Sequence, residues 1–404
     1  MKIVMRFLIG VSFVAISACG GSGGGGGTVS AEETGVLLDS PVINIGYRTE
    51  TLEGITNALG EYKYLPGETV TFFIGDLVFP AVTATRTITP IELAGTLDTA
   101  NSKVINMIRL LQTLDKDGDP LNGITITDLA KSSATLVDFN LSEADFAASP
   151  GVMNLILNAG LVAPVTELVS AADAFSHFKQ ALIDAGILPA EFNYSLYNDF
   201  SDPSGNIDFT LWATQAGATT ASTLEIVNGS LNATAVKDGD VRANQGLWVQ
   251  NATNVSLSDF QAFRADFTIL QATGNAVNRA QILLGIPLET ADYFVDTGIN
   301  FYDSGEITYF IEIFNRLGLP TTEIVSGTIA TVDPAVTHTL AIGWDGSNYI
   351  FQVDNIVPVV LPMNAETDIS LSSNWGWAAV RATVKDAGTG TTVAKIDNVQ
   401  MGGD

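Results

Sequence analysis

The chain is poor in the residues that most metal and nucleophile chemistry needs. Among its 404 residues there is one cysteine, Cys19, and there are two histidines, His177 and His338. A single cysteine cannot form a disulfide within the chain or a zinc–thiolate cluster. Two isolated histidines do not make an imidazole-rich metal centre. The sequence also lacks the G-x-S-x-G motif of α/β-hydrolases. Thiolate, zinc and serine-hydrolase chemistry are therefore not expected.

Basic residues are scarce as well. The chain has 18 Lys and Arg residues against 44 Asp and Glu residues, a net charge of −26. Such an acidic chain repels nucleic acid and anionic lipid headgroups, so no nucleic-acid partner is expected. Hydrophobic residues make up 46% of the sequence and charged residues 15%, which leaves ample material for a core. The length is sufficient for two or three domains.

The first 18 residues are typical of a secretory signal peptide. Lys2 and Arg6 precede an apolar run over residues 7–16, and small residues follow the run. The run is too short to span a bilayer as a stable helix. Ile16-Ser17-Ala18-Cys19 resembles the lipobox of bacterial lipoproteins, which implies that Cys19 carries a lipid.

A flexible tether follows the cysteine, because seven of the next eight residues are glycine. We therefore expect a lipidated Cys19 and a Gly-rich tether over residues 19–35. Residue 20 is Gly rather than Asp, which by analogy with proteobacterial lipoproteins favours the outer membrane, on its periplasmic or cell-surface face. The membrane, reached through the lipid anchor, is thus one expected partner.

Residues 36–188 are predicted to form a β-plus-helical domain. Turns near residues 57–60, 66–68 and 75–76 separate short β-like segments, which is typical of a small β-sandwich. Apolar residues then recur with helical spacing over 102–114 and 166–182. This half resembles uncharacterised surface lipoproteins of marine proteobacteria, in the segments LDSPV (38–42), GETV (67–70), LQTLDKDGD (111–119) and NGI (122–124). The resemblance implies no known activity.

Residues 192–404 are predicted to form a larger β domain. We expect strands over 209–213, 222–226, 246–250, 263–270, 279–284, 292–302, 307–314, 337–344, 349–353, 377–384 and 394–400. The hairpin segment HTLAIGWDGSNYIFQVDN (338–355) and the closing KIDNV (395–399) resemble concanavalin A-like, or laminin-G-like, domains. The expected fold class is mainly β with a helical insert: a small β-sandwich plus helices, then a larger antiparallel jelly-roll β-sandwich.

The acidic loop after the first long helix is a candidate calcium site. Asp115, Asp117 and Asp119 alternate, and Asn122 follows them. Side chains at alternate positions of a tight loop can converge, and carboxylate oxygens are the ligands that Ca²⁺ prefers. The loop departs from an EF-hand at Pro120 and at Ile126, so it would have to be another kind of calcium loop, with Asp128 as a further ligand. The alternative is a solvated turn.

Sugar binding is the activity that the C-terminal half favours. Trp344 and Trp375, with Asn374 beside the latter, are the candidate ligand-binding residues, because an aromatic ring can stack on a pyranose. The alternative is that these tryptophans fill the core. The Glu-x-Asp-x-x-Glu motif of glucanases with this fold is absent. Glu306 and Glu312 are six residues apart, about 20 Å along a strand, too far for a carboxyl pair. No catalytic residue is predicted.

The sequence thus predicts a cell-surface lipoprotein that acts as a non-catalytic glycan-binding or adhesion module. Its ligand would be a polysaccharide or surface glycan, with calcium as a cofactor. One alternative is a structural or scaffold lipoprotein that binds another protein. A second alternative is a divergent polysaccharide hydrolase or lyase. Two nearby carboxylates in a groove would favour the enzyme.

Overall fold

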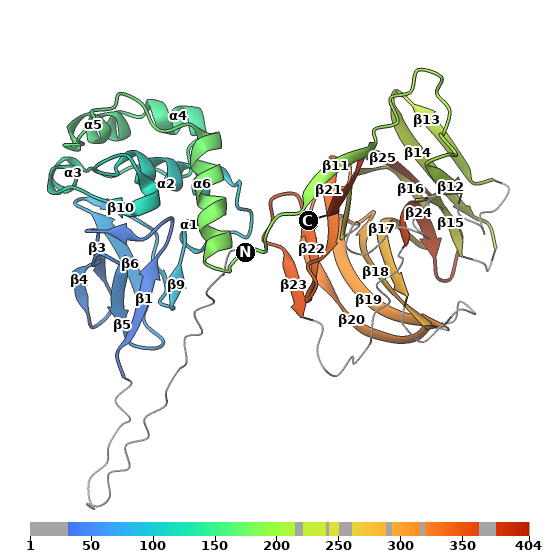
Figure 1. Cartoon of the computed structure of the whole chain (residues 1–404), viewed down its shortest axis with the longest axis horizontal. Coiled ribbons are helices and arrows are strands. Elements are labelled where there is room, and N and C mark those ends of the chain that lie inside the picture. The colour runs from blue at the N-terminus through green and yellow to red at the C-terminus, as the bar shows by residue number, and fades with distance from the viewer. Residues whose placement is uncertain are drawn as a thin grey trace, which may run out of the picture.

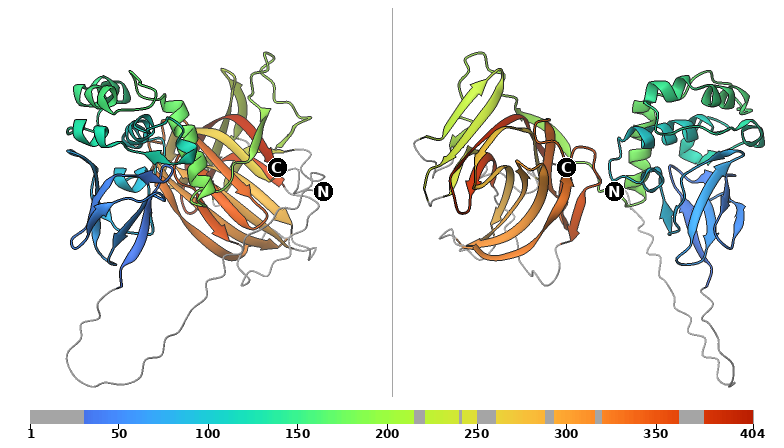
Figure 2. Two further views of the ribbon diagram at one scale, coloured as in Figure 1. Left: turned by 60° about the vertical axis from the view of Figure 1, so that its left-hand side comes forward. Right: turned by 180° about the vertical axis from the view of Figure 1, so that it is seen from behind.

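The computed structural model describes residues 31–214, 221–239, 242–249, 261–287, 293–315, 320–362 and 377–403. The signal peptide, Cys19 and most of the tether therefore lie outside the described residues. The described chain is mostly β, and its elements form an N-terminal group and a C-terminal group that lie side by side (Figures 1 and 2). No helix in these ranges is both long enough and apolar enough to cross a membrane.

The N-terminal group begins with small sheets of short strands. One sheet has the order β5-β1-β9, a second has the order β4-β3-β6-β7 with β8 also on β6, and β10 pairs with β2. Apolar side chains alternate with polar ones along β6, which buries Val70, Phe72 and Ile74. The strands are β1 (Glu33–Leu37), β2 (Val42–Ile43), β3 (Gly46–Arg48), β4 (Glu53–Ile55), β5 (Glu61–Tyr64), β6 (Thr69–Ile74), β7 (Leu77–Val78), β8 (Val82–Thr83), β9 (Thr87–Ile88) and β10 (Ile124–Thr125).

Helices cover one side of these sheets (Figure 1). They are α1 (Pro90–Ala94), α2 (Ser102–Thr113), α3 (Asp128–Ser133), α4 (Glu143–Ala148), α5 (Pro150–Asn158) and α6 (Ala171–Asp184), with a short 3₁₀ turn over Pro120–Asn122. Asn101 caps α2 by accepting a hydrogen bond from the Lys103 amide. His177 of α6 is hydrogen-bonded through Nε2 to Ser40 Oγ at 3.0 Å, so this histidine has a packing role.

The C-terminal group is the jelly-roll sandwich that the sequence predicts. One sheet has the order β13-β14-β25-β16-β21-β22-β23, with β11 also on β25, and the other has the order β12-β15-β24-β17-β18-β19-β20. The strands are β11 (Asn193–Asn198), β12 (Trp212–Thr214), β13 (Thr223–Val227), β14 (Ser230–Lys237), β15 (Ala243–Val249), β16 (Ala262–Gly274), β17 (Val277–Pro287), β18 (Tyr293–Tyr302), β19 (Glu306–Asn315), β20 (Pro320–Thr331), β21 (His338–Trp344), β22 (Asn348–Val353), β23 (Val359–Pro362), β24 (Trp377–Lys385) and β25 (Gly390–Gly403).

The core of the sandwich lies between these two sheets. In β17 the side chains of Ala280, Ile282 and Leu284 are fully buried and belong to this core. Because successive side chains of a strand point to opposite faces, Arg279, Gln281 and Leu283 lie on the outer face of the second sheet. The same alternation along β18, β19 and β24 places polar residues on that outer face, where the candidate site is found.

Backbone hydrogen bonds join the two groups of elements. The amide of Thr99, in the loop between α1 and α2, donates to the carbonyl of Asn355 at 3.0 Å, and the amide of Val357 donates to Leu97 O at 2.8 Å. Val357 also packs against the cluster around Ile91, Ile105 and Phe178. The loop between β22 and β23 is thereby held against the helices of the N-terminal group.

Candidate active site

A hollow of about 360 Å³ opens on the outer face of the second sheet. We call it the outer hollow. Strands β17, β18, β19, β20 and β24 supply most of its lining, and these strands follow one another across the sheet. Its charged lining residues are Arg242, Arg279, Asp296, Glu312, Arg381 and Lys385, and its polar ones include Gln281, Asn300, Tyr302 and Thr308.

Two carboxyl groups face each other in the outer hollow. Asp296 of β18 is the direct partner of Glu312 on the neighbouring antiparallel strand β19. The Cβ atoms of two such opposite residues are about 4.5–5.5 Å apart. One carboxylate oxygen of Asp296, Oδ1, is buried and has no hydrogen-bond partner among the described residues. The pair thus presents an unpaired carboxyl oxygen in a partly enclosed site.

The surroundings of Asp296 raise the pKa of its carboxyl group, so the group stays protonated to a higher pH than an exposed aspartate does. Burial raises the pKa of Asp296 to about 7; the positive charge of Arg381 lowers it, and the negative charge of Glu312 raises it further. A carboxyl group with such a pKa can donate a proton near neutral pH. It is the kind of group that a general acid requires.

The opposite end of the hollow is held by an amide and guanidinium network. Gln281 Oε1 accepts hydrogen bonds from Arg381 Nε at 2.7 Å, from Thr383 Oγ1 at 2.9 Å and from Arg242 Nη2 at 3.3 Å. Gln281 Nε2 donates to Asn300 Oδ1 at 2.6 Å. These bonds fix Gln281, so the attached guanidinium groups are held in place as well.

The floor between these two ends is apolar. Gly298 lies on β18 between Asp296 and Asn300, and its neighbours Leu283 and Phe310 are buried on the same face. A Cβ added at Gly298 would lie 2.6 Å from the Phe310 ring and 2.7 Å from Leu283. Glycine is therefore required for these two side chains to meet. Trp248 packs against the same cluster.

Carboxylate spacing along a single strand does not reveal this site. Glu306 and Glu312 do lie on one strand, but the partner of Glu312 is Asp296 on the next strand. The sequence does contain a signal for this pairing. A tight turn at residues 303–305 fixes the register of the hairpin, so residues at equal distances before and after the turn face each other. Glu306 is bound elsewhere and accepts a hydrogen bond from Thr328 Oγ1 at 2.9 Å.

The structure does not favour the sugar-stacking role predicted for Trp344. Its side chain is 9% exposed, belongs to the sandwich core, and packs on Tyr349 with the ring centroids 4.8 Å apart. A buried ring has no open face for a sugar, so this expectation is corrected to the core-filling alternative. Asn374 and Trp375 lie outside the described residues. Among the tryptophans, Trp248 lies on the same sheet face as the outer hollow.

The predicted calcium loop is folded around Asp117. Asp117 accepts hydrogen bonds from the Asp119 amide at 3.2 Å and from Asn122 Nδ2 at 3.1 Å. Asp115 is buried, and its Oδ2 has no hydrogen-bond partner among the described residues. Burial raises the pKa of Asp115, and the Asp117 carboxyl raises it further.

The remaining contacts of this loop give less support to a metal site. Asp128 pairs with Lys131 at 3.1 Å, so it is already occupied. Within the described ranges, no three His, Cys, Asp or Glu side chains come together as a metal-binding group. Calcium binding through Asp115, Asp117, Asp119 and Asn122 therefore stays a prediction, and the buried oxygen of Asp115 is the feature that supports it.

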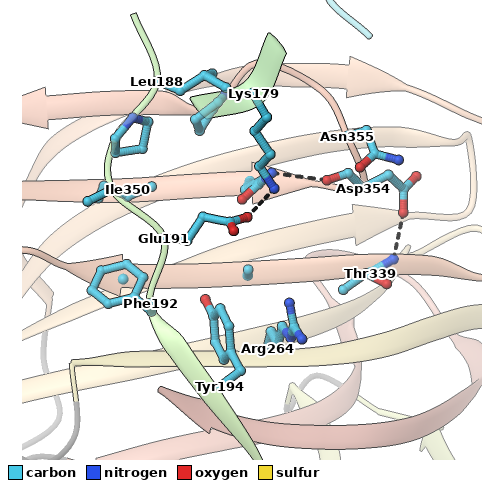
Figure 3. Close-up of a pocket in the computed structure, with 16 residues that line it drawn as sticks. Lys179, Leu188, Glu191, Phe192, Tyr194, Arg264, Thr339, Ile350, Asp354 and Asn355 are labelled. Carbon is cyan, nitrogen blue, oxygen red and sulfur yellow. Dashed lines mark hydrogen bonds and ion pairs between the residues drawn. The ribbon is translucent and has the colours of Figure 1, made fainter. Parts of the chain in front are cut away.

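A second hollow, the junction hollow, is lined by Arg264 on the outer face of the first sheet and by residues of α6 and of the segment that leads into β11 (Figure 3). Its charged groups are already paired. Lys179 of α6 is ion-paired with Glu191. Arg264 lies 4.0 Å from the centroid of the Tyr194 ring, and its Nε donates to Gln400 at 2.8 Å. This hollow is a packed junction between the two groups of elements.

Comparisons with known proteins concern the jelly-roll. No protein-family model and no curated protein matches the chain. Among solved structures, it is similar to a laminarinase from Flavobacterium sp. (13% identity over 52% of this chain and 100% of that one, TM-score 0.38). It is also similar to the catalytic domain of a Thermotoga petrophila endo-1,3-beta-glucanase (12%, 53% and 100%, 0.37) and to a transglycosylase in complex with NAG (15%, 54% and 85%, 0.36).

The two large antiparallel sheets confirm the fold class, and the main functional interpretation needs correction. The sequence favoured a non-catalytic glycan-binding or adhesion module, whereas the solved structures to which the chain is similar are those of glucanases and a transglycosylase. An enzyme was not expected because the two glutamates on one strand, Glu306 and Glu312, are too far apart to act as a carboxyl pair. That reason does not hold, because Asp296 and Glu312 face each other across two strands.

Asp296 should make the protein less stable as the pH rises. An unfolded aspartate has a pKa of about 3.9, whereas burial raises the pKa of Asp296 to about 7. Between these values the unfolded chain has lost a proton that the folded chain keeps, so unfolding becomes easier with rising pH. Asp296→Asn, neutral throughout, should flatten the melting temperature between pH 4 and 8 and melt above wild type at pH 8.

The control for this measurement is Glu306→Gln on β19. Glu306 is an exposed carboxylate on the same sheet, hydrogen-bonded to Thr328, so its variant should keep the wild-type pH slope. Parallel melting curves for wild type and Asp296→Asn across this pH range would contradict the raised pKa of Asp296.

Calcium should stabilise the protein through the acidic loop. Extracellular calcium loops often bind at about 10⁻⁴–10⁻³ M, so about 10 mM Ca²⁺ should stabilise the folded state by on the order of 1–3 kcal/mol. Asp117→Ala should abolish the shift in melting temperature between calcium and chelator, and the exposed Glu167→Ala should keep it. Calorimetry without heat of binding up to millimolar calcium would show a bare turn.

Proposed function

We propose that the jelly-roll is a polysaccharide hydrolase with its active centre in the outer hollow. The observation that carries the proposal is the pair formed by Asp296 and Glu312, one of which has a pKa raised to about 7. Glycoside hydrolysis uses such a pair, with one carboxyl protonated and the other ionised near neutral pH.

The spacing of the pair favours retention of configuration. Carboxyl groups of retaining enzymes are about 5–5.5 Å apart and those of inverting enzymes about 6.5–9.5 Å. Directly opposite residues on antiparallel strands have Cβ atoms about 4.5–5.5 Å apart, and Asp296 and Glu312 are such residues. With this spacing we assign Glu312 as the nucleophile and Asp296 as the acid.

The reaction then has two balanced steps. Glu312 attacks the anomeric carbon, the glycosidic C–O bond breaks, and Asp296 gives its proton to the departing oxygen. In the second step Asp296 takes a proton from water, the water oxygen attacks the anomeric carbon, and the ester to Glu312 breaks. One water is consumed for each bond cleaved, and both carboxyl groups return to their starting state.

Loss of either carboxyl should abolish cleavage. The full-length protein should release reducing ends from at least one member of a panel of neutral and acidic polysaccharides. Asp296→Asn and Glu312→Gln should each reduce that rate by about 10²-fold or more, because each removes one of the two groups that bond cleavage uses. Glu306→Gln, six residues from Glu312 along β19, should retain the rate.

Proton NMR of the first product would show the anomer and test retention. Reducing ends that form at the wild-type rate with Asp296→Asn would refute the assignment, as would a full panel without any cleavage. Unsaturated sugar products absorbing in the ultraviolet would instead indicate a lyase.

We also propose that the protein is anchored to the outer membrane through Cys19, with residues 20–35 as a tether. The lipobox-like Ile16-Ser17-Ala18-Cys19 and the glycine run support this location. Mass spectrometry of the membrane-extracted protein should find a chain that begins at a lipid-modified Cys19. Cys19→Ser should leave a soluble chain. An unmodified Cys19 in the extracted protein would exclude the anchor.

A further inference from the structure

We infer that the polysaccharide bound in the outer hollow is anionic, a chain of uronic acid or sulfated sugars whose charged group contacts Arg242, Arg279 and Arg381. The inference rests on the proposed function and adds the substrate class to it. It is argued from the charge, the burial and the hydrogen bonding of these three guanidinium groups.

The concentration of positive charge is the first argument. The chain carries a net charge of −26 and has only 18 Lys and Arg residues in all. Four of these residues, the three arginines and Lys385, line this single hollow, where the described part of the chain contributes two acidic residues. A net positive hollow on an acidic protein attracts anions locally while the rest of the surface repels them.

The second argument is that two of the arginines are buried, and none of the three forms a direct ion pair with Asp296 or Glu312 in the same hollow. Arg279 is 7% and Arg381 is 6% exposed, and burial lowers the pKa of Arg381 to about 9. The ion pairs found among the described residues involve Lys131, Lys179 and His338, so none of the three arginines has an acidic partner within 4 Å there. A buried cation without a partner is costly, and a bound anion would remove that cost.

The side chains that accept hydrogen bonds from these guanidinium groups are neutral. Arg242 donates to Asn244 Oδ1 at 3.0 Å and Arg279 Nη1 donates to the Tyr302 hydroxyl at 3.3 Å. Arg279 Nε is buried and has no acceptor among the described residues. These contacts orient the guanidinium groups but leave their charge in place. A planar guanidinium matches a carboxylate or a sulfate with two parallel hydrogen bonds.

The third argument is the distance from the carboxyl pair. The Gln281 and Asn300 pair, which holds two of the arginines, lies four residues from Asp296 along β18, about 13 Å on an extended strand. The apolar floor at Gly298 lies between them. An anionic group held by the arginines would thus belong to a different sugar unit from the one whose bond is cleaved. This geometry favours a polymer over a small free anion.

The test is a binding measurement that does not need cleavage. Calorimetry on full-length Asp296→Asn would compare polygalacturonate, a sulfated galactan and the neutral glucan laminarin. We expect an acidic polymer to bind at least about tenfold more tightly than laminarin, the worth of one charge-assisted hydrogen bond, and to weaken as salt is added. Adding Arg242→Gln or Lys385→Gln, both half-buried, should weaken it by about tenfold.

Lys395→Gln is the matched control, because Lys395 is half-buried on the other sheet and carries the same charge; it should leave binding unchanged. Melting curves would show that each variant is folded. Laminarin bound as tightly as both acidic polymers, or arginine variants with wild-type affinity, would overturn the inference. So would equal binding of inorganic sulfate or of an oligonucleotide. Acidic-polymer binding without cleavage by the wild type would refute only the proposed hydrolase.

Discussion

The register between β18 and β19 is the constraint on which the site depends. The two strands are joined by a tight turn in which the Gly305 amide donates to the Tyr302 carbonyl at 3.0 Å. Gly305 has a φ of +85°, and a Cβ there would lie 2.0 Å from the carbonyl oxygen of Val332. Only glycine fits this position. A slip of one residue would turn Asp296 into the core and separate it from Glu312.

The local part of this arrangement was accessible from the sequence. The strands expected over 292–302 and 307–314 agree closely with β18 and β19, and the intervening turn defines which residues face one another. The basic end was not accessible. Arg381 and Gln281 face each other because β24 pairs with β17, a sheet order that alternating hydrophobicity does not encode. Strand β14 was not predicted from the sequence, because its inward side chains are mostly alanine.

The predicted roles of the aromatic and acidic residues differ for a related physical reason. The tryptophan ring of Trp344 is of a type that can stack on a sugar. The side chain, however, points from β21 into the core, where it packs on Tyr349. Asp296 carries no motif at all, and its pKa depends on burial and on charges from other strands. Chemistry that depends on a neighbour across a sheet becomes visible only once the pairing is known.

The two ends of the site have different origins in the chain, and this has a consequence for how substrate preference can change. The carboxyl pair belongs to one continuous hairpin, whereas Arg242 and Arg381 come from segments that are remote in sequence. In the hydrolase that we propose, substitutions beside β15 or in β24 would alter which polymer is recognised, while the carboxyl pair of the hairpin stays intact. Polymer preference in the proposed enzyme would thus change through drift in those two segments, with the carboxyl pair inherited unchanged.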